Sequence, residues 1–392
     1  MGRFLVMDVV FYGSSLNYDQ GSGNYQELKK ITRWDGRQYT LVSRYALRYS
    51  LLETGRKLGL WEVAEGEKLH RAGSGDNTVI QPATDLLLTG DILLYPEFDL
   101  FGYLITSTTP QNFRSAPAKL SHAISMTPFN YDALFNANLG MANRIRKVYG
   151  EMKPNPFTAE EHETFYLYSL VIDLDEVGKL DVFLTLGSDI TLGRDENGKE
   201  IKAKIEDVVS EGNRVKFILK DGKSKEELVQ SEKVTLDTFE KINNKLVHIR
   251  YSLSPEEQRK RIENLIKGVL SLKRSIKGRE EDLRPRLLVL GIYKDKPYQT
   301  FKDKIQLVDE YTEEEYDEIE RETKDGKEVI RVKHRISKSR KPVFTISGLQ
   351  EAEIKELSES EVLGLVNKLF DTEDKLEEVK VFKDTSVEVR PK

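Results

Sequence analysis

The sequence predicts an α+β protein, and three observations carry that prediction. Residues 4–12 (FLVMDVVFY) are rich in branched and aromatic side chains, which predicts a strand. Residues 165–180 (FYLYSLVIDLDEVGKL) are apolar on both faces, as in a central strand. Residues 254–270 begin with a capping box and then repeat apolar residues at helical spacing. Strands and helices therefore share one chain.

The elements between these anchors follow from local patterns. Ser43 is the expected N-cap of a short helix that stops at Gly55. Residues 56–97 contain both polar and apolar stretches and are expected to be an insertion. Residues 98–107 again have strand character, and a helix and then a loop broken by prolines follow. Turns at ENGK, EGN and KDGK predict a small β-hairpin insert at 190–236, and residues 286–293 predict another strand. This order of elements is that of an RRM or ferredoxin-like sandwich with large insertions.

Composition restricts the classes of protein that this chain can represent. Its 392 residues are 38% hydrophobic and 32% charged, and no apolar run reaches the roughly 18 residues that a membrane helix needs. Without cysteine there are no disulfides, thiol nucleophiles or thiolate metal sites. The first residues predict a strand rather than a signal peptide, so we expect a cytoplasmic protein without a membrane partner.

The net charge of −5 conceals an uneven distribution. Residues 1–150 carry 16 Lys and Arg against 14 Asp and Glu, whereas residues 309–392 carry 16 against 23. The acidic residues are therefore concentrated toward the end of the chain. A basic track in the first part remains compatible with nucleic-acid binding, which depends on where the charges lie.

Catalytic motifs are absent from the sequence. The five histidines are scattered, and there is no HExxH, Walker phosphate loop or nucleophile elbow. We therefore expect no catalytic residue, no metal and no cofactor. Arg44 and Arg48 are four residues apart and share a helix face, which fits either phosphate binding or an ordinary solvated face. Loops that mix Asn, Ser, cations and aromatics suit single-stranded nucleic acid.

Five short motifs in a fixed order resemble one protein family. They are LNYD at 16–19, SRYALR at 43–48, LFGY at 100–103, SHAISM at 121–126 and FYLYSLVIDL at 165–174. The chain resembles the backbone subunit of type I CRISPR effector complexes (Cascade), in particular the DevR-type autoregulator branch of subtype I-B. Tyr18, Arg44 and Leu47 depart from the family pattern, so individual phosphate contacts differ.

The resemblance implies a hand-shaped protein. An RRM-like palm would comprise residues 1–55, 98–127, 165–189 and 237–308. Fingers at 56–97 and a thumb at 128–164 would be insertions into this palm. The β-hairpin insertion at 190–236 and an acidic, mixed α/β region at 309–392 lie outside the resemblance.

The resemblance also implies function, partners and site residues. The subunit would bind CRISPR RNA, form a helical oligomer with further copies of itself and with other Cascade subunits, and support recognition of the target DNA strand paired to the guide in antiviral defence. It would act as a scaffold and not as an enzyme. The expected RNA-binding residues are Asn17, Tyr18, Ser43, Arg44, Arg48, Lys119, Ser121, His122, Asn143, Arg144, Arg146 and Lys147.

Two alternatives stay open at this point. Related type III backbone subunits cleave target RNA with an aspartate in a loop, and Asp19 or Asp132 are the candidates here. The autoregulator label of the family instead suggests a protein that binds RNA or DNA of its own operon. Lys119 and Ser121 fit an RNA contact, whereas His122 fits RNA, a neighbouring subunit or packing against the palm.

Overall fold

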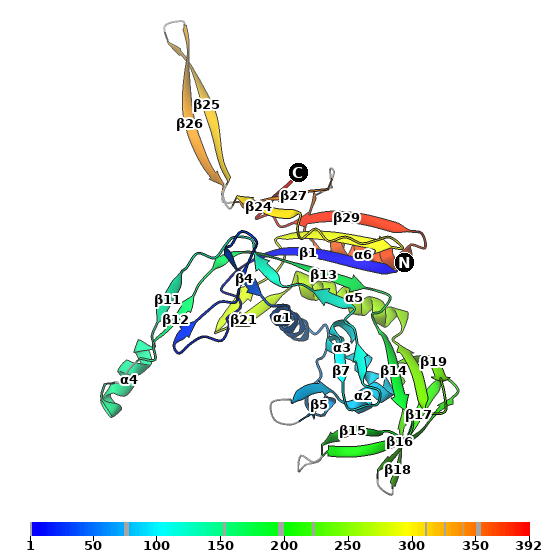
Figure 1. Ribbon diagram of the computed structural model, residues 1–392. Helices are drawn as coiled ribbons and strands as arrows, with labels where there is room; N and C mark the ends of the chain where they lie inside the picture. The colour runs from blue at the N-terminus through cyan, green and yellow to red at the C-terminus, as the bar shows by residue number, and fades with distance from the viewer. Residues whose placement is uncertain are drawn as a thin grey trace.

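A computed structural model describes residues 2–73, 78–151, 154–194, 200–221, 224–309, 312–324, 327–339, 341–349 and 354–392. The protein is a mixed α+β structure, as the sequence predicts, and strands predominate over helices. Figure 1 shows a central body from which two elongated segments project. Among the described residues, no helix combines the length and apolar character needed to span a membrane.

Strand β1 (Arg3–Ser14) lies at the centre of the main sheet. It pairs antiparallel with β13 (Glu163–Asp173) on one side and with β23 (Leu287–Lys294) on the other. Its side chains alternate between two cores. Leu5, Met7, Val9 and Phe11 face the core that contains the helices, and Val10 faces the core on the opposite side. The apolar run therefore has the length and composition of a strand covered on both faces.

The main sheet is antiparallel around its centre, and helices cover one face. Helices α1 (Arg44–Lys57), α5 (Pro255–Leu270) and α6 (Glu359–Asp371) all contribute to the same core as β1. Strand β9 (Ala118–Leu120) pairs with a further stretch of β13. The order across the sheet is β28 (Ile354–Glu356), β29 (Leu376–Lys383), β23, β1, β13, β10 (Ala123–Ser125), β4 (Gln38–Val42) and β3 (Lys30–Thr32).

The acidic end of the chain is integrated into this sheet. Strand β29 pairs with β23 along its whole length, and Val362 and Leu369 of α6 are buried in the main core. Strands β24 (Ile305–Asp309), β27 (Val343–Ile346) and β30 (Glu388–Pro391) form a small sheet over the opposite face. The hairpin of β25 (Thr312–Lys324) and β26 (Lys327–Ser339) projects from there (Figure 1).

The predicted hairpin insert at 190–236 is larger than a hairpin. Its residues form a sheet in the order β15 (Asp189–Arg194), β16 (Glu200–Glu211), β17 (Arg214–Asp221) and β18 (Ser224–Val229). Apolar side chains at alternating positions of β16 and β17 build a second core with α2 (Thr84–Thr89) and α3 (Pro96–Phe101); they are Ala203, Ile205, Val208, Val215, Phe217 and Leu219. Many surface charges hide this alternation in the sequence.

The second core also includes strands that the sequence assigns to the palm. Strands β14 (Lys179–Thr185), β20 (Leu246–Ser252) and β19 (Thr235–Lys241) pair with one another and not with the main sheet. Two hairpins and short helices complete this part: η1 (Gly66–Lys68), β5 (Leu69–Ala72), β6 (Val79–Pro82), η3 (Asp91–Leu94), β7 (Tyr103–Ile105) and β8 (Asn112–Arg114).

A slender arm occupies most of the predicted thumb. Strands β11 (Ala133–Asn136) and β12 (Phe157–Glu160) form an antiparallel ribbon that carries α4 (Leu139–Tyr149) at its end (Figure 1). Strand β2 (Tyr25–Gln26) runs parallel to β12 at its base. After α5, the chain forms a hairpin of β21 (Lys273–Ile276) and β22 (Arg279–Asp282).

Candidate nucleic-acid interface

Two of the predicted contact residues anchor the amino-terminal end of α1. The Ser43 hydroxyl accepts a hydrogen bond from the Ala46 N–H at 3.2 Å, as an N-cap does. The Asn17 Oδ1 accepts from the Ser43 N–H at 2.9 Å, and the Asn17 side chain is buried. Both side chains therefore position α1, which begins at the surface with Arg44.

Arg44 and Arg48 surround the exposed ring of Tyr45. Their guanidinium carbons lie 5.0 and 5.7 Å from its centroid, and the Arg44 Nη2 donates a hydrogen bond to the Tyr45 hydroxyl at 3.0 Å. That bond and the charge of Arg44 lower the pKa of the tyrosine. The first turn of α1 contains no acidic residue. This face therefore presents positive charge beside an aromatic surface.

Lys119 lies beside these two arginines. It comes from β9, and its exposed side chain lines a cavity of about 340 Å³ together with Arg44, Tyr45 and Arg48. We call this cavity the α1 groove; Phe101 and Leu120 complete its apolar wall. Cations from two segments about 70 residues apart in the sequence thus converge on a space that can hold an anionic chain.

Ser121 and His122 lie between β9 and β10, beside the groove. The His122 Nδ1 accepts a hydrogen bond from the Arg44 N–H at 3.0 Å, and the neutral ring can act as this acceptor. Partial burial, and then the charges of Arg44, Lys302 and Lys29, lower the pKa of His122. The Ser121 hydroxyl accepts from the Ser169 N–H at 2.9 Å. His122 therefore supports the backbone of Arg44 within a cationic surrounding.

Lys302 is a site residue that the sequence analysis missed. Its Nζ donates to the Ser121 Oγ at 3.1 Å and to the His122 carbonyl at 3.2 Å. The loop that carries it is held by Asp8, whose Oδ2 accepts from the Phe301 N–H at 2.6 Å. A carboxylate inside an apolar strand needs buried partners, so Asp8 is the signal in the sequence that pointed to such an attachment.

Tyr18 lies under the β21–β22 hairpin. The Lys277 Nζ lies 3.6 Å from the centroid of its ring, and the tyrosine is partly buried. Burial, followed by the nearby charge of Glu161, raises the pKa of Tyr18. Arg274 of the same hairpin donates to the Leu16 carbonyl at 2.7 Å, so it attaches the hairpin to the loop that contains Tyr18.

The remaining predicted residues lie on α4, away from the α1 groove (Figure 1). Asn143, Arg144, Arg146 and Lys147 are all exposed. In the part of the chain that the structure describes, no carboxylate pairs with these three cations. Ile145 and neighbouring apolar residues line a shallow cavity of about 440 Å³ on the same helix. The predicted residues therefore form two separate clusters.

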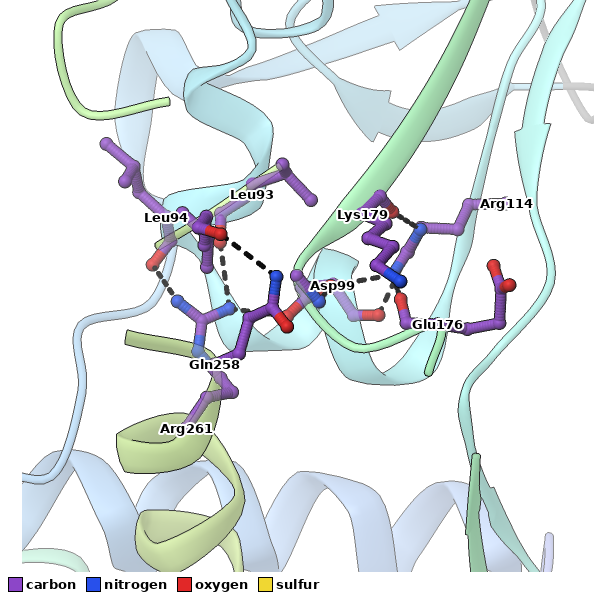
Figure 2. A network of polar contacts seen from close by, with 10 residues as sticks. Leu93, Leu94, Asp99, Arg114, Glu176, Lys179, Gln258 and Arg261 are labelled. Carbon is purple, nitrogen blue, oxygen red and sulfur yellow. Dashed lines mark hydrogen bonds and ion pairs between the residues drawn. The ribbon is translucent and has the colours of Figure 1, made fainter. Parts of the chain in front are cut away.

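A buried ion network fixes the wall of the α1 groove. Asp99 of α3 is fully buried and pairs with Arg114 at 2.7 Å and with Arg261 of α5 at 2.8 Å (Figure 2). Arg114 also donates to the Glu176 carbonyl at 2.7 Å, and Arg261 donates to the Leu93 carbonyl at 2.8 Å. The network joins the helix that carries Phe101, the segment that leads to Lys119, and the second core.

Each of the two aspartates considered as catalytic candidates contacts a neighbouring segment. Asp19 is exposed and pairs with Lys29 at 3.5 Å. The Asp132 carbonyl accepts from the Glu161 N–H at 3.0 Å in the arm. The described residues contain no cluster of three His, Asp or Glu side chains that could hold a metal ion.

Comparison with known proteins adds a family. Residues 5–316 match the family model described as "CRISPR-associated negative auto-regulator DevR/Csa2". The curated proteins contain no match. Solved structures with related chains include a "CRISPR RNA-guided surveillance complex, pre-nicking" at 10% identity, with a TM-score of 0.39 over 76% of this chain and 80% of the other. A "CRISPR RNA-guided surveillance complex" has 11% identity and a TM-score of 0.35, covering 76% and 72%. A "Type IV-B CRISPR Complex" has 13% identity and a TM-score of 0.27, covering 43% and 71%.

Proposed function

Because the chain belongs to the CRISPR-associated DevR/Csa2 family, we propose that it is a CRISPR RNA-binding backbone subunit of a type I Cascade complex, of subtype I-B and located in the cytoplasm. Several copies would line up along one guide RNA with other Cascade subunits. The guide would recognise a target DNA strand by base pairing, while the protein holds the RNA backbone.

The observation that carries this proposal is the convergence of cations on the α1 groove. Arg44, Arg48 and Lys119 line one cavity, and Lys302 extends the positive surface through Ser121 and His122. Binding of an RNA backbone requires several cations close together, and a net charge of −5 for the whole chain does not prevent such a local cluster. Asn17 and Ser43 contribute indirectly, since they set the position of α1.

The strand order supports an RRM-type palm. Strands β23, β1, β13 and β10 lie side by side in that order, with α1 and α5 on one face. In chain order the elements run β1, α1, β10, β13, α5 and β23, which is the order of a ferredoxin-like sandwich. The arm that ends in α4 would be the thumb, with Arg144, Arg146 and Lys147 against the RNA backbone and Ile145 as a wedge.

The experiment that tests the proposal is purification of the chain with the products of its operon. We expect an RNA with a repeat-derived handle to remain bound, and the same complex to leave complementary RNA intact when a divalent metal is added. A complex free of RNA would contradict the proposal. Periodic cleavage that Asp19→Ala or Asp132→Ala abolishes would instead support an RNA-cleaving subunit.

The description of the matching family as a negative auto-regulator favours a second function. The same cationic groove would then bind RNA or DNA from its own operon. Specific retention of an operon sequence, in the absence of any guide RNA, would support this role.

A further inference from the structure

Trp34 is a large apolar side chain left almost entirely in water. It is 92% exposed at the tip of the β3–β4 hairpin, at the edge of the main sheet. Trp61 has a different environment, since its Nε1 donates to the Leu52 carbonyl at 3.0 Å. Tryptophan is highly buried on average, and an indole as exposed as this one offers the whole face of its ring to a partner.

The tip holds Trp34 in a defined position. The Gly36 N–H donates to the Arg33 carbonyl at 3.0 Å, and the Arg33 N–H donates to the Arg37 carbonyl at 3.0 Å. Gly36 has a φ of +74°, a conformation that favours glycine. The Asp35 carboxylate accepts from the Arg37 N–H at 3.0 Å and from the Tyr39 hydroxyl at 2.8 Å. These contacts order the turn and leave the indole free.

Positive charge lies at the hairpin tip as well as beside the α1 groove. Asp35 is paired with Arg37 at 2.8 Å, whereas the Arg33 guanidinium lies 5.0 Å over the Tyr39 ring. Burial lowers the pKa of Lys302, the charge of Asp8 opposes this shift, and the charge of Arg33 adds to it. Lys302 in turn contacts Ser121 and His122 beside the groove. Positive charge thus extends from the α1 groove to Lys302, and Arg33 adds positive charge at the hairpin tip.

We propose that Trp34 is a base-stacking subsite for single-stranded RNA. The indole takes the face of one unpaired base, and Arg33 and Lys302 contact the phosphates next to it. Aromatic stacking with flanking cations is how proteins hold single strands without reading their sequence, so this subsite accepts any base. The proposal rests on the proposed function, because the RNA is the strand held in the α1 groove.

Tryptophan fluorescence tests the subsite directly, since the chain has two tryptophans. In the full-length Trp61→Phe variant, with excitation selective for tryptophan, Trp34 is the only tryptophan that emits. Titration with single-stranded oligouridine is expected to quench this emission in parallel with the rise in RNA anisotropy. If that variant fails to fold, the difference between the wild-type and Trp34→Phe signals reports the same residue. If RNA quenches Trp34 before any complementary DNA is added, the base that stacks on the indole belongs to the RNA.

Substitutions separate stacking from simple apolar contact. Stacking on one aromatic ring contributes about 1–3 kcal/mol, so Trp34→Ala is expected to weaken RNA binding roughly 5- to 150-fold. Trp34→Leu is expected to behave like Trp34→Ala, whereas Trp34→Phe retains most of the affinity. A leucine variant with wild-type affinity would overturn a stacking role.

Three further outcomes also decide against the subsite. If oligouridine binds without changing Trp34 emission, and if Trp34→Ala binds it with wild-type affinity, the subsite is overturned. The proposal for the α1 groove then still stands. No RNA binding by the wild-type protein overturns both proposals. If Trp34→Ala abolishes self-association in sedimentation without RNA, while RNA affinity is unchanged, the tip is a contact between copies of this chain.

Discussion

Asp8 connects the buried centre of the main sheet to the candidate site. Its carboxylate lies in the buried centre of β1, and burial raises its pKa. The Ser169 hydroxyl and the Phe301 N–H donate hydrogen bonds to it. These partners hold the loop that brings Lys302 to Ser121. A buried carboxylate in β1 thus helps to set the position of a cation beside the residues that join β9 and β10.

Salt dependence tests the two arginines of the α1 groove. Each phosphate contact releases counterions, so the double variant Arg44→Ala and Arg48→Ala is expected to reduce the slope of log K against log[salt] by about one unit per lost contact. RNA anisotropy at a series of salt concentrations measures this slope. Arg56→Ala, in the last turn of the same helix, is the matched control and should leave it unchanged. An unchanged slope in the double variant would remove α1 from the site.

At the scale of elements, the residues at the amino-terminal cap of α1 have a structural role that differs from the binding role expected of them. The sequence predicted Asn17 and Ser43 as RNA contacts, and the structure uses both to orient the helix. Tyr18 and Arg274 show a similar attachment, because the β21–β22 hairpin packs against the loop that follows β1. The groove is therefore shaped by elements that do not themselves line it.

Substitution of Ser43 distinguishes these two roles. Ser43→Ala removes the cap and is expected to lower the free energy of unfolding by about 1 kcal/mol. Ser43→Asp keeps a capping oxygen and the stability, but its negative charge beside Arg44 is expected to weaken RNA binding. Urea unfolding and RNA anisotropy on both variants provide the measurements. If Ser43→Ala weakened RNA binding at unchanged stability, the hydroxyl would be a direct contact.

At the scale of the whole molecule, the Asp99 network joins two separate hydrophobic cores. Asp99 and Arg114 belong to the segments that connect the second core to the sheet, and Arg261 belongs to α5 of the main core. The three side chains are nearly or fully buried. Because each guanidinium also donates to a backbone carbonyl, the network holds the relative position of α3, α5 and β8.

Removal of the central charge is expected to be costly. Asp99→Ala leaves two buried guanidinium groups without their carboxylate, and breaking such a pair typically costs about 3–5 kcal/mol. Urea unfolding measures this loss, and RNA affinity should fall as well because Lys119 loses its support. Asp371→Asn, which removes an exposed partner of Arg259, should cost at most about 1 kcal/mol. Equal losses in the two variants would contradict a structural role for the network.

The extent of the main sheet could not be read from the acidic end of the chain. Residues LEEVKVFK form β29, where Val381 and Phe382 are buried, but the charged residues of that stretch masked its strand pattern. The sequence likewise predicted only a hairpin for the region that contains β16 and β17, which belong to a larger sheet. Alternation of apolar and charged residues marks a strand but does not identify its partners, so it indicates strands here and not the sheets that they form.

What the sequence determined by itself is local. It placed β1, α1, β13, α5 and β23, because each has an apolar period or a cap within a few residues, and it placed Arg44 and Arg48 on one helix face. Only the tertiary structure brought Lys119 and Lys302 to those arginines, assigned Asn17 and Ser43 to the support of α1, and left Trp34 in solvent. These features depend on contacts between segments far apart in the chain, and burial and pairing decide such contacts only when the whole fold forms.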